Sequence, residues 1–168
     1  MRQVKQEDAF DPVVFTTLAN RLDSIVRESM QACVQSARSS VLQARDLSAS
    51  ISDSHVRLLS IAQGLPIHVL TSNMAILPIL ELFDDIAPGD CFLNNAPFLG
   101  CAHHADFCFC TPVFHDNKLM FWVMLKAHQA DTGASEPTVY LPFAKDVYEE
   151  GIHWPCVRVQ RDYKDLAD

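Results

Sequence analysis

The sequence predicts an α+β fold in which a long amino-terminal helix packs on a mixed or antiparallel sheet that contains a central β-hairpin. Apolar residues recur every three or four positions across residues 11–37, which is typical of one buried helical stripe. Residues 105–114 and 119–126 are apolar runs on either side of a short polar turn, as in a hairpin. With 168 residues, 49% of them hydrophobic, we expect a single domain over residues 1–168 with its own core.

The first helix is expected to begin at Asp11 and to end near residue 37. Asp11 can accept a hydrogen bond from a free main-chain amide, and Pro12 fits the first helical turn. The residues of the stripe are Val14, Leu18, Leu22, Ile25, Val26 and Met30. We expect this stripe to be buried against the sheet.

Two strands are expected after the helix. Residues 47–52 alternate between apolar residues and serine, which predicts a half-buried strand with Asp46 at its beginning. A second strand is expected over residues 56–61, before a turn formed by GLPIH at residues 64–68.

A second helix is expected over residues 71–83, with Pro78 close to a break or kink. Residues 87–90 have the composition of a turn, and residues 91–93 form a short apolar strand that leads to two asparagines. From Thr132 onward the chain is expected to be mostly irregular.

Charge and composition exclude several classes of protein. The net charge of −8 opposes attraction to phosphates, so we do not expect nucleic-acid binding. No run approaches the roughly 20 apolar residues of a membrane span, and the first ten residues lack the apolar core of a secretory signal. The six cysteines show no paired framework, and Cys108 and Cys110 are too close for a zinc ribbon. We expect a cytoplasmic protein with reduced, buried thiols.

A pair of His-x-x-Asp sequences carries the strongest chemical signal. His103 precedes Asp106 and His128 precedes Asp131, one pair at each end of the predicted hairpin. Chance packing explains this repetition poorly. For His55, His115 and His153 individually, a hydrogen-bonded imidazole with no further role is the better interpretation, and His104 is expected to point away from its neighbour.

The hairpin brings the two pairs together. A turn centred on residues 116–117 places His128 opposite Ala105, so that His103 and His128 share a face and their rings can converge on one ion. Asp106 then has the opposite parity and needs a bend or bulge to turn its carboxylate inward. Mixed imidazole and carboxylate ligation suits manganese, iron or zinc better than calcium, and such an ion polarises a carbonyl oxygen or lowers the pKa of a water.

Around these residues the sequence resembles the hydantoinase B family, which includes subunits of acetone and acetophenone carboxylases and half of the ATP-dependent oxoprolinases. PGDCFLNNAPFLGCAHHAD at residues 88–106 is similar to the family's PGDVFxxNDPYxGGTHxxD, and TPVFHDNKLMFWVMLKAHQADTG at residues 111–133 to TPVFxDGxLVxFVxxxAHHADxGG. Further similar segments are residues 11–30, 44–53, 65–74 and 148–159.

The resemblance implies specific site residues. The family's metal ligands fall on His103, Asp106 and His128, with Asp46, His68, Asp131 and Glu150 as further catalytic candidates. A capping carboxylate is the alternative for Asp46, and a solvated turn residue is the alternative for Glu150. The family's pattern is changed at Ala96, Cys101, Gln129 and Ala134, which implies a stiffer loop and one carboxylate fewer near the site.

The resemblance also implies an enzyme complex, of which this chain is the amino-terminal part of one subunit. The expected partners are a hydantoinase A-like subunit that binds ATP and the remaining hydantoinase B-like chain, acting on a small carbonyl compound. The chain has no Walker-type glycine loop of its own. The first expectation is a ketone carboxylase, favoured by the aromatic residues Phe107, Phe109, Phe121 and Trp122. Cyclic amide hydrolysis, a non-catalytic assembly subunit and, more weakly, a stand-alone metal hydrolase are the alternatives.

Overall fold

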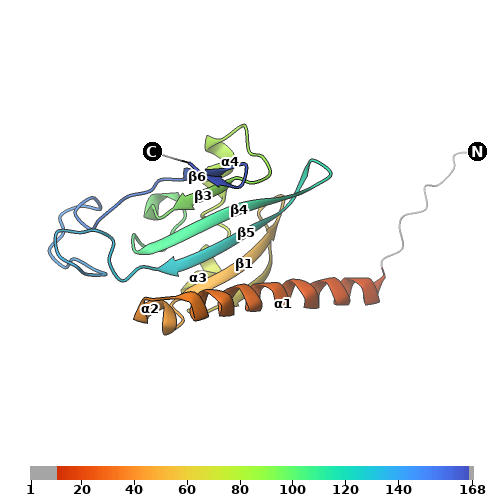
Figure 1. Ribbon diagram of the computed structural model, residues 1–168, viewed down its shortest axis with the longest axis horizontal. Coiled ribbons are helices and arrows are strands. Elements are labelled where there is room, and N and C mark those ends of the chain that lie inside the picture. Colours follow the sequence, from red (N-terminus) through yellow and green to blue (C-terminus); the bar gives the residue numbers. More distant parts are fainter. Residues whose placement is uncertain (1–10, 167–168) are drawn as a thin grey trace, which may run out of the picture.

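One antiparallel sheet of seven strands, in the order β2-β1-β5-β4-β3-β6-β7, organises the computed structural model (Figure 1). The structure describes residues 11–166; residues 1–10, on which the expectation about a secretory signal falls, lie outside this part. The strands are β1 (Leu47–Asp53), β2 (Leu58–Gln63), β3 (Cys91–Asn94), β4 (Asp106–His115), β5 (Lys118–His128), β6 (Val157–Arg161) and β7 (Lys164–Asp165). The helices are α1 (Pro12–Ser36), α2 (Ser40–Gln43), α3 (Ile67–Thr71), α4 (Leu77–Leu82) and the 3-10 turn η1 (Pro97–Leu99). The predicted α+β class, with a long helix on an antiparallel sheet, is confirmed.

The first helix begins and ends as predicted, but only part of its stripe is buried. The Asp11 carboxylate accepts hydrogen bonds from the amides of the next turn, at 2.8 and 3.2 Å, and so caps α1. Val26 and Met30 are buried against β1 and β2, whereas Val14 and Leu18 are 53% and 56% exposed. Figure 1 shows the reason, because the amino-terminal turns of α1 extend beyond the sheet. The prediction of a wholly buried stripe is therefore wrong.

The first two strands differ from the prediction in detail. The apolar residues of β1 pack against α1, and its serines face the other side of the sheet. Both sets are buried, so β1 is not the half-buried strand that we predicted. β2 begins two residues later than predicted because Val56 has a positive φ of 62° in the turn after β1.

The predicted second helix over residues 71–83 is instead two short helices. α3 ends at Thr71, and α4 begins only at Leu77. Pro78 lies in the first turn of α4, where a missing amide proton costs nothing, so it starts a helix and kinks none. As a result His68 lies on a helix and not in the turn that we expected.

The hairpin of β4 and β5 forms as predicted around a two-residue turn. Asp116 and Asn117 both have positive φ, 48° and 61°, as a tight hairpin turn requires. Near the turn the register shifts, because Phe114 pairs with Leu119 while Val113 pairs with Phe121. This bulge leaves Met120 without a partner on β4 and displaces all later pairs by one residue.

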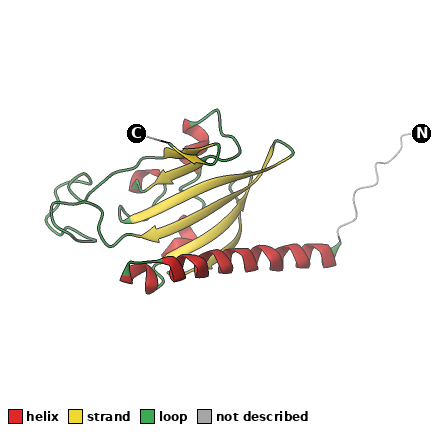
Figure 2. Ribbon diagram, in the orientation of Figure 1, coloured by secondary structure: helices red, strands yellow, loops and turns green. Residues whose placement is uncertain are grey.

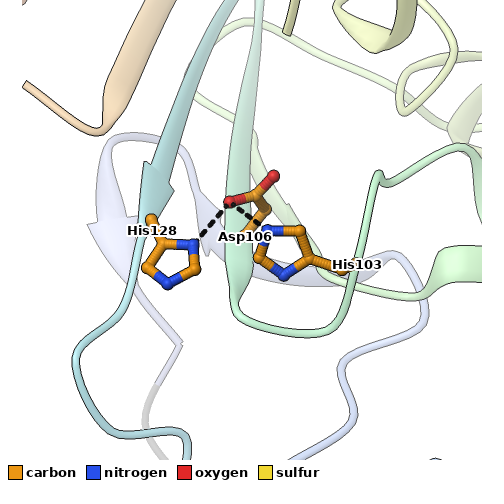
Figure 3. A group of neighbouring side chains, drawn as sticks. All are labelled: His103, Asp106 and His128. Carbon is orange, nitrogen blue, oxygen red and sulfur yellow. Dashed lines mark hydrogen bonds and ion pairs between the residues drawn. The ribbon is translucent and has the colours of Figure 1, made fainter. Parts of the chain in front are cut away.

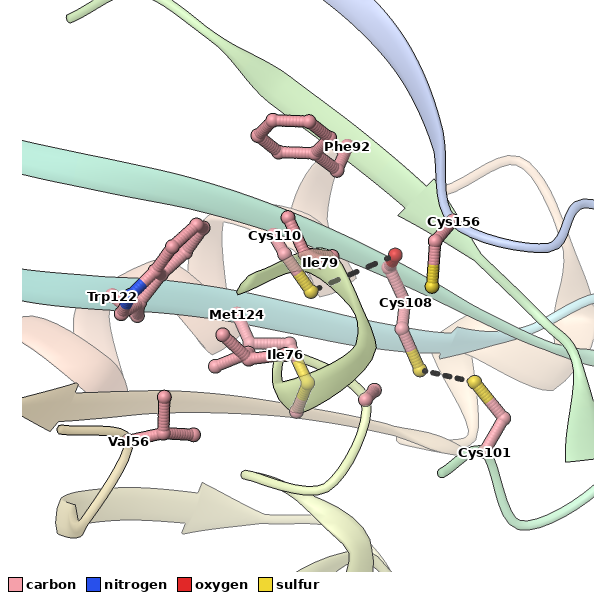
Figure 4. Close-up of a cluster of buried hydrophobic side chains, with 11 residues drawn as sticks. Val56, Ile76, Ile79, Phe92, Cys101, Cys108, Cys110, Trp122, Met124 and Cys156 are labelled. Atoms are coloured by element: carbon pink, nitrogen blue, oxygen red, sulfur yellow. Dashed lines mark hydrogen bonds between the residues drawn. The ribbon is translucent and has the colours of Figure 1, made fainter. Parts of the chain in front are cut away.

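Two apolar clusters lie on the two faces of the sheet. One packs between α1 and the sheet, and the other lies beneath α4 and includes Trp122, Met124 and the cysteines of β4 (Figure 4). All six cysteines are free, and five are buried, as expected of small apolar side chains. Within residues 11–166 no helix has the length and apolarity needed to cross a bilayer.

The carboxy-terminal part is only partly irregular. Residues 129–156 form the long loop drawn at one end of the sheet in Figure 2. β6 then pairs with β3, and β7 pairs with β6. The prediction of a mostly irregular segment from Thr132 onward thus missed two strands, of which β7 forms an edge of the sheet.

Candidate metal centre

His103, Asp106 and His128 meet at one end of the sheet (Figure 3). Their ligand atoms all lie within 4.8 Å of one another. Oδ1 of Asp106 is 3.3 Å from Nε2 of His103 and 3.3 Å from Nδ1 of His128. Asp106 is fully buried and His128 is nearly so, whereas His103 is partly exposed. The group is therefore a buried carboxylate with imidazoles on its open side.

The bulge at Met120 is what brings Asp106 into the group. It places His128 directly opposite Asp106 and not opposite Ala105 as predicted. Directly paired residues point to the same face of a sheet, so the carboxylate faces the imidazole without any further distortion. The predicted register placed Asp106 on the opposite face from His128, and the bulge in the hairpin brings both residues to the same face.

The loop before β4 carries His103 and is held from two sides. Gly100 has a φ of 90°, and a Cβ there would lie 2.3 Å from the carbonyl oxygen of Met74, so only glycine fits. The buried Asn95 side chain donates to the carbonyl oxygens of His104 (3.0 Å) and Ile152 (2.8 Å). These contacts fix the loop on which His103 stands.

Asp46 and His68 complete the buried side of the centre. The amide of His128 donates to the carbonyl oxygen of Asp46 at 3.1 Å, which holds Asp46 beside the strand end. Oδ2 of Asp46 is 3.8 Å from Nδ1 of His128, and its Oδ1 is 3.9 Å from Nε2 of His68. Nε2 of His68 also lies 3.5 Å from Oδ2 of Asp106. Both predicted residues are thus brought into the cluster.

Asp131 and Glu150 are not in the cluster. The exposed Asp131 carboxylate accepts the amide of Gly133 at 2.8 Å and closes a turn. Glu150 is half-buried, and its carbonyl oxygen accepts the hydroxyl of Thr132 at 2.7 Å. Within residues 11–166 no ion pair joins either carboxylate to the three ligand candidates. The ring of His104 stacks on His153 at 5.4 Å and also takes no part in the cluster.

Sequence reasoning missed Tyr140. Its ring centroid lies 5.5 Å from that of His103 and 6.0 Å from that of His128, so the tyrosine covers the open side of the centre. Burial raises the pKa of Tyr140, and the nearby carboxylates of Asp106, Asp46 and Glu150 raise it further. Tyr140 stands in the irregular loop, where no pattern marks a residue as functional. The electrostatic effect on this phenol connects Glu150 to the centre.

The electrostatics of the centre follow from burial and close contact. Burial alone raises the pKa of Asp106, but the hydrogen bond with His128 and the close imidazoles of His68 and His103 outweigh it and hold that pKa well below its usual range. The hydrogen bond with Asp106 raises the pKa of His128, whereas burial lowers the pKa of His103. Asp106 is therefore ionised at neutral pH.

The donor set fits a divalent ion. Oδ2 of Asp106 and Oδ1 of Asp46 are buried and have no hydrogen-bond partner. The 3.5 Å between His68 and Oδ2 is the distance of an ion pair, longer than a good hydrogen bond. Unsatisfied buried carboxylate oxygens are costly. Two imidazoles and a carboxylate whose ligand atoms lie this close together match the ligand types of first-row divalent metals.

Known proteins share both the sequence pattern and the fold. The beta subunit of caprolactamase from Pseudomonas jessenii is 32% identical over 89% of this chain and 26% of its own length. The delta subunit of acetophenone carboxylase from Aromatoleum aromaticum is 29% identical over 97% of this chain and 24% of its own length. The chain thus spans about a quarter of the length of these relatives.

Solved structures agree. The chain superposes on nucleotide-free acetone carboxylase with a TM-score of 0.86 at 24% identity, over 93% of this chain and 21% of the other. It superposes on the ATP-dependent caprolactamase of P. jessenii with a TM-score of 0.79 at 30% identity, over 94% and 28%. The family model described as hydantoinase B/oxoprolinase matches residues 11–168. The chain belongs to the hydantoinase B/oxoprolinase family.

Proposed function

We propose that this chain supplies the metal-holding part of a multi-subunit, ATP-dependent enzyme that acts on a small carbonyl compound. The observation that carries the proposal is the convergence of His103, Asp106 and His128 within 4.8 Å. Manganese, iron or zinc suits this donor set. A bound ion would polarise a carbonyl or carboxylate oxygen of the substrate.

The residues around the three ligands have separate proposed roles. Asp46, 3.8 Å from His128, is placed to accept a proton or to orient a bound group. Tyr140 lies on the open side, and its raised pKa keeps the phenol protonated as a hydrogen-bond donor toward substrate. Glu150 acts through Tyr140, because its carboxylate raises the pKa of that phenol. Asp131 shapes the loop that carries Tyr140, since its carboxylate closes a turn.

Two reactions remain candidates, ketone carboxylation first and cyclic amide hydrolysis second. The aromatic residues no longer favour a ketone, because Trp122 packs in one core cluster and Phe121 against the other. Acetophenone carboxylase, a relative by its delta subunit, supports the first reaction, and the 32% identity to the caprolactamase beta subunit supports the second. We propose that a hydantoinase A-like partner binds ATP, that the remaining hydantoinase B-like chain completes the subunit, and that the complex is cytoplasmic, in keeping with six free cysteines.

Metal analysis of the purified chain tests the proposal. We expect about one manganese, iron or zinc ion per chain, and loss of that ion in His103→Ala and in His128→Ala. His115→Ala is the matched control, because that imidazole is exposed at the hairpin tip and should leave the metal content unchanged. A folded wild-type chain that takes up no metal, yet still assembles with its partners, would support the non-catalytic assembly role instead.

Reconstitution with the partner subunits separates the two reactions. ATP hydrolysis coupled to bicarbonate uptake on acetophenone would identify a ketone carboxylase, whereas ATP-coupled opening of caprolactam would identify a cyclic amide hydrolase. Turnover by the chain alone without ATP would overturn the proposal and favour a stand-alone metal hydrolase.

A further inference from the structure

Two successive rows of side chains face the same side of the sheet beneath α3. The first row is Asp46, His128 and Asp106, the group described above. The second row lies two residues further from the sheet end, where Lys126 of β5 pairs with Ser48 of β1 and with Cys108 of β4. All three residues of the second row are fully buried. No metal ligand comes from this row, and its polar members have no role in the proposed function.

His68 connects the two rows. It projects from α3 and is 1% exposed, and each of its two ring nitrogens contacts residues of a different row. Nδ1 lies 2.7 Å from the hydroxyl oxygen of Ser48. Nε2 lies 3.5 Å from Oδ2 of Asp106 and 3.9 Å from Oδ1 of Asp46. One ring therefore touches both carboxylates and a serine of the row below.

The proton on this ring can be assigned from its surroundings. The amide of Gly64 donates to the hydroxyl oxygen of Ser48 at 3.2 Å, which leaves the single hydroxyl proton free for Nδ1 of His68. Nε2 then carries the ring proton and faces carboxylates, which only accept. The tautomer with the proton on Nδ1 would point the lone pair of Nε2 at two carboxylates, which is unfavourable. A positively charged ring would also carry a proton on Nε2. In the metal-free protein, both the neutral ring and the imidazolium therefore make Nε2 a donor, and a nitrogen that carries a proton cannot bind a metal.

Polar contacts also hold α3 in place. Nζ of Lys126 donates to the hydroxyl of Thr71, the last residue of α3, and the hydroxyl of Ser72 donates to the carbonyl oxygen of His68. Two apolar side chains of the same helix, Ile67 and Leu70, are 51% and 76% exposed, and Val69 is half-buried. Lys126 and Ser48 of the second row thus both contact this helix, and they help to hold His68 in position.

We infer that His68 is a positioning residue for the proposed metal centre, with its ring fixed by Ser48 so that Nε2–H faces the carboxylates of Asp106 and Asp46. This inference rests on the proposed function. Nε2–H of His68 faces Oδ2 of Asp106 at 3.5 Å, and Oδ1 lies between the imidazoles of His103 and His128. Groups that orient metal-binding carboxylates in this way typically change metal affinity 10- to 100-fold when removed, in round numbers.

The test compares Ser48→Ala with Ser50→Ala in the full chain. Ser50 lies on the same strand and face, is equally buried, and its hydroxyl has no hydrogen-bond partner, so it is a matched control. Nitrogen NMR of the His68 ring in the metal-free protein should show a protonated Nε2 in the wild type and in Ser50→Ala. Ser48→Ala should lose this single pattern and weaken Zn²⁺ or Mn²⁺ binding about 10- to 100-fold, while Ser50→Ala binds as the wild type does.

The inference is overturned if Nε2 is unprotonated in the wild type, or if Ser48→Ala keeps both the ring pattern and the metal affinity. Its failure differs from failure of the proposed function, because a wild-type chain that binds no metal can still show the predicted ring proton. Should Ser48→Ala fail to fold, His68→Gln and His68→Leu provide the comparison. The glutamine amide can still donate to Asp106 and should retain most of the affinity, whereas leucine should not; equal affinities would overturn the inference.

Discussion

Replacing Asp106 with asparagine removes the one charge on which the three imidazoles converge. Asp106 is fully buried, with His103 and His128 at 3.3 Å from one oxygen and His68 at 3.5 Å from the other. The asparagine oxygen can still accept on one side, but its amide then points its protons at the Nε2 proton of His68. Hydrogen bonds to charged groups are worth about 1.5–3 kcal/mol each, and these are long. We therefore expect Asp106→Asn to lower the unfolding free energy of the metal-free protein by roughly 2 kcal/mol.

Urea unfolding in the presence of a chelator measures this difference, and its pH dependence checks the cause. The pKa of Asp106 is lowered in the folded state, so the ionised group adds stability above its unfolded pKa of about 3.9. That contribution is lost as the pH falls toward the folded value. The difference in unfolding free energy between wild type and Asp106→Asn should therefore be largest near neutral pH and should decrease as the pH falls below about 4.

Asp116→Asn is the control, because Asp116 is exposed at the hairpin tip with a positive φ that asparagine tolerates equally well. It should change stability by less than about 0.5 kcal/mol. Equal unfolding free energies of wild type and Asp106→Asn at neutral pH, or a difference that grows in acid, would refute the reasoning.

Three further outcomes follow from the geometry. When the pH is lowered from 8, metal affinity should already begin to decrease before pH 6.5 is reached, because the raised pKa of His128 lets protons compete with the metal there. His103 has a lowered pKa and should be protonated only in more acid solution. Calorimetric titrations from pH 8 to 5 measure this dependence, and an affinity that stays constant down to pH 6 would contradict it. Gly100→Ala should cost at least about 1–3 kcal/mol in urea unfolding, because its Cβ meets the carbonyl of Met74; an unchanged midpoint would contradict the close approach. Tyr140→Phe should leave metal affinity within about twofold but lower turnover of the reconstituted enzyme by about 100-fold or more; unchanged turnover would remove Tyr140 from the site.

The sequence predicted the hairpin well but not its register. The apolar runs over residues 105–114 and 119–126 and the short polar turn between them were enough to locate both strands. The bulge at Met120 has no marker such as glycine or proline, and it changes which residues face each other. Local pattern therefore located the ligands along the chain, and only the three-dimensional pairing showed that Asp106 faces the same side as His128.

Other parts of the site depend on contacts between distant segments. His68 lies 38 positions before Asp106 in the numbering, and its role rests on α3 lying over the sheet, which follows from the buried contacts of Ser48 and Lys126. Tyr140 comes from an irregular loop, where spacing carries no information. In the amino-terminal half of α1, periodicity identified the apolar face correctly. It could not show that no part of the sheet covers this half of the helix in the described structure. Whether residues 1–168 form one domain stays a prediction.

The most direct test of the metal centre is an anomalous-difference map from crystals of the chain grown with Zn²⁺ or Mn²⁺. We expect one strong peak at about 2.0–2.2 Å from a ring nitrogen of His103, a ring nitrogen of His128 and an oxygen of Asp106, with His68 outside the coordination sphere. A map with no peak among these three side chains, or with the ion bound elsewhere in the chain, would contradict the proposed centre.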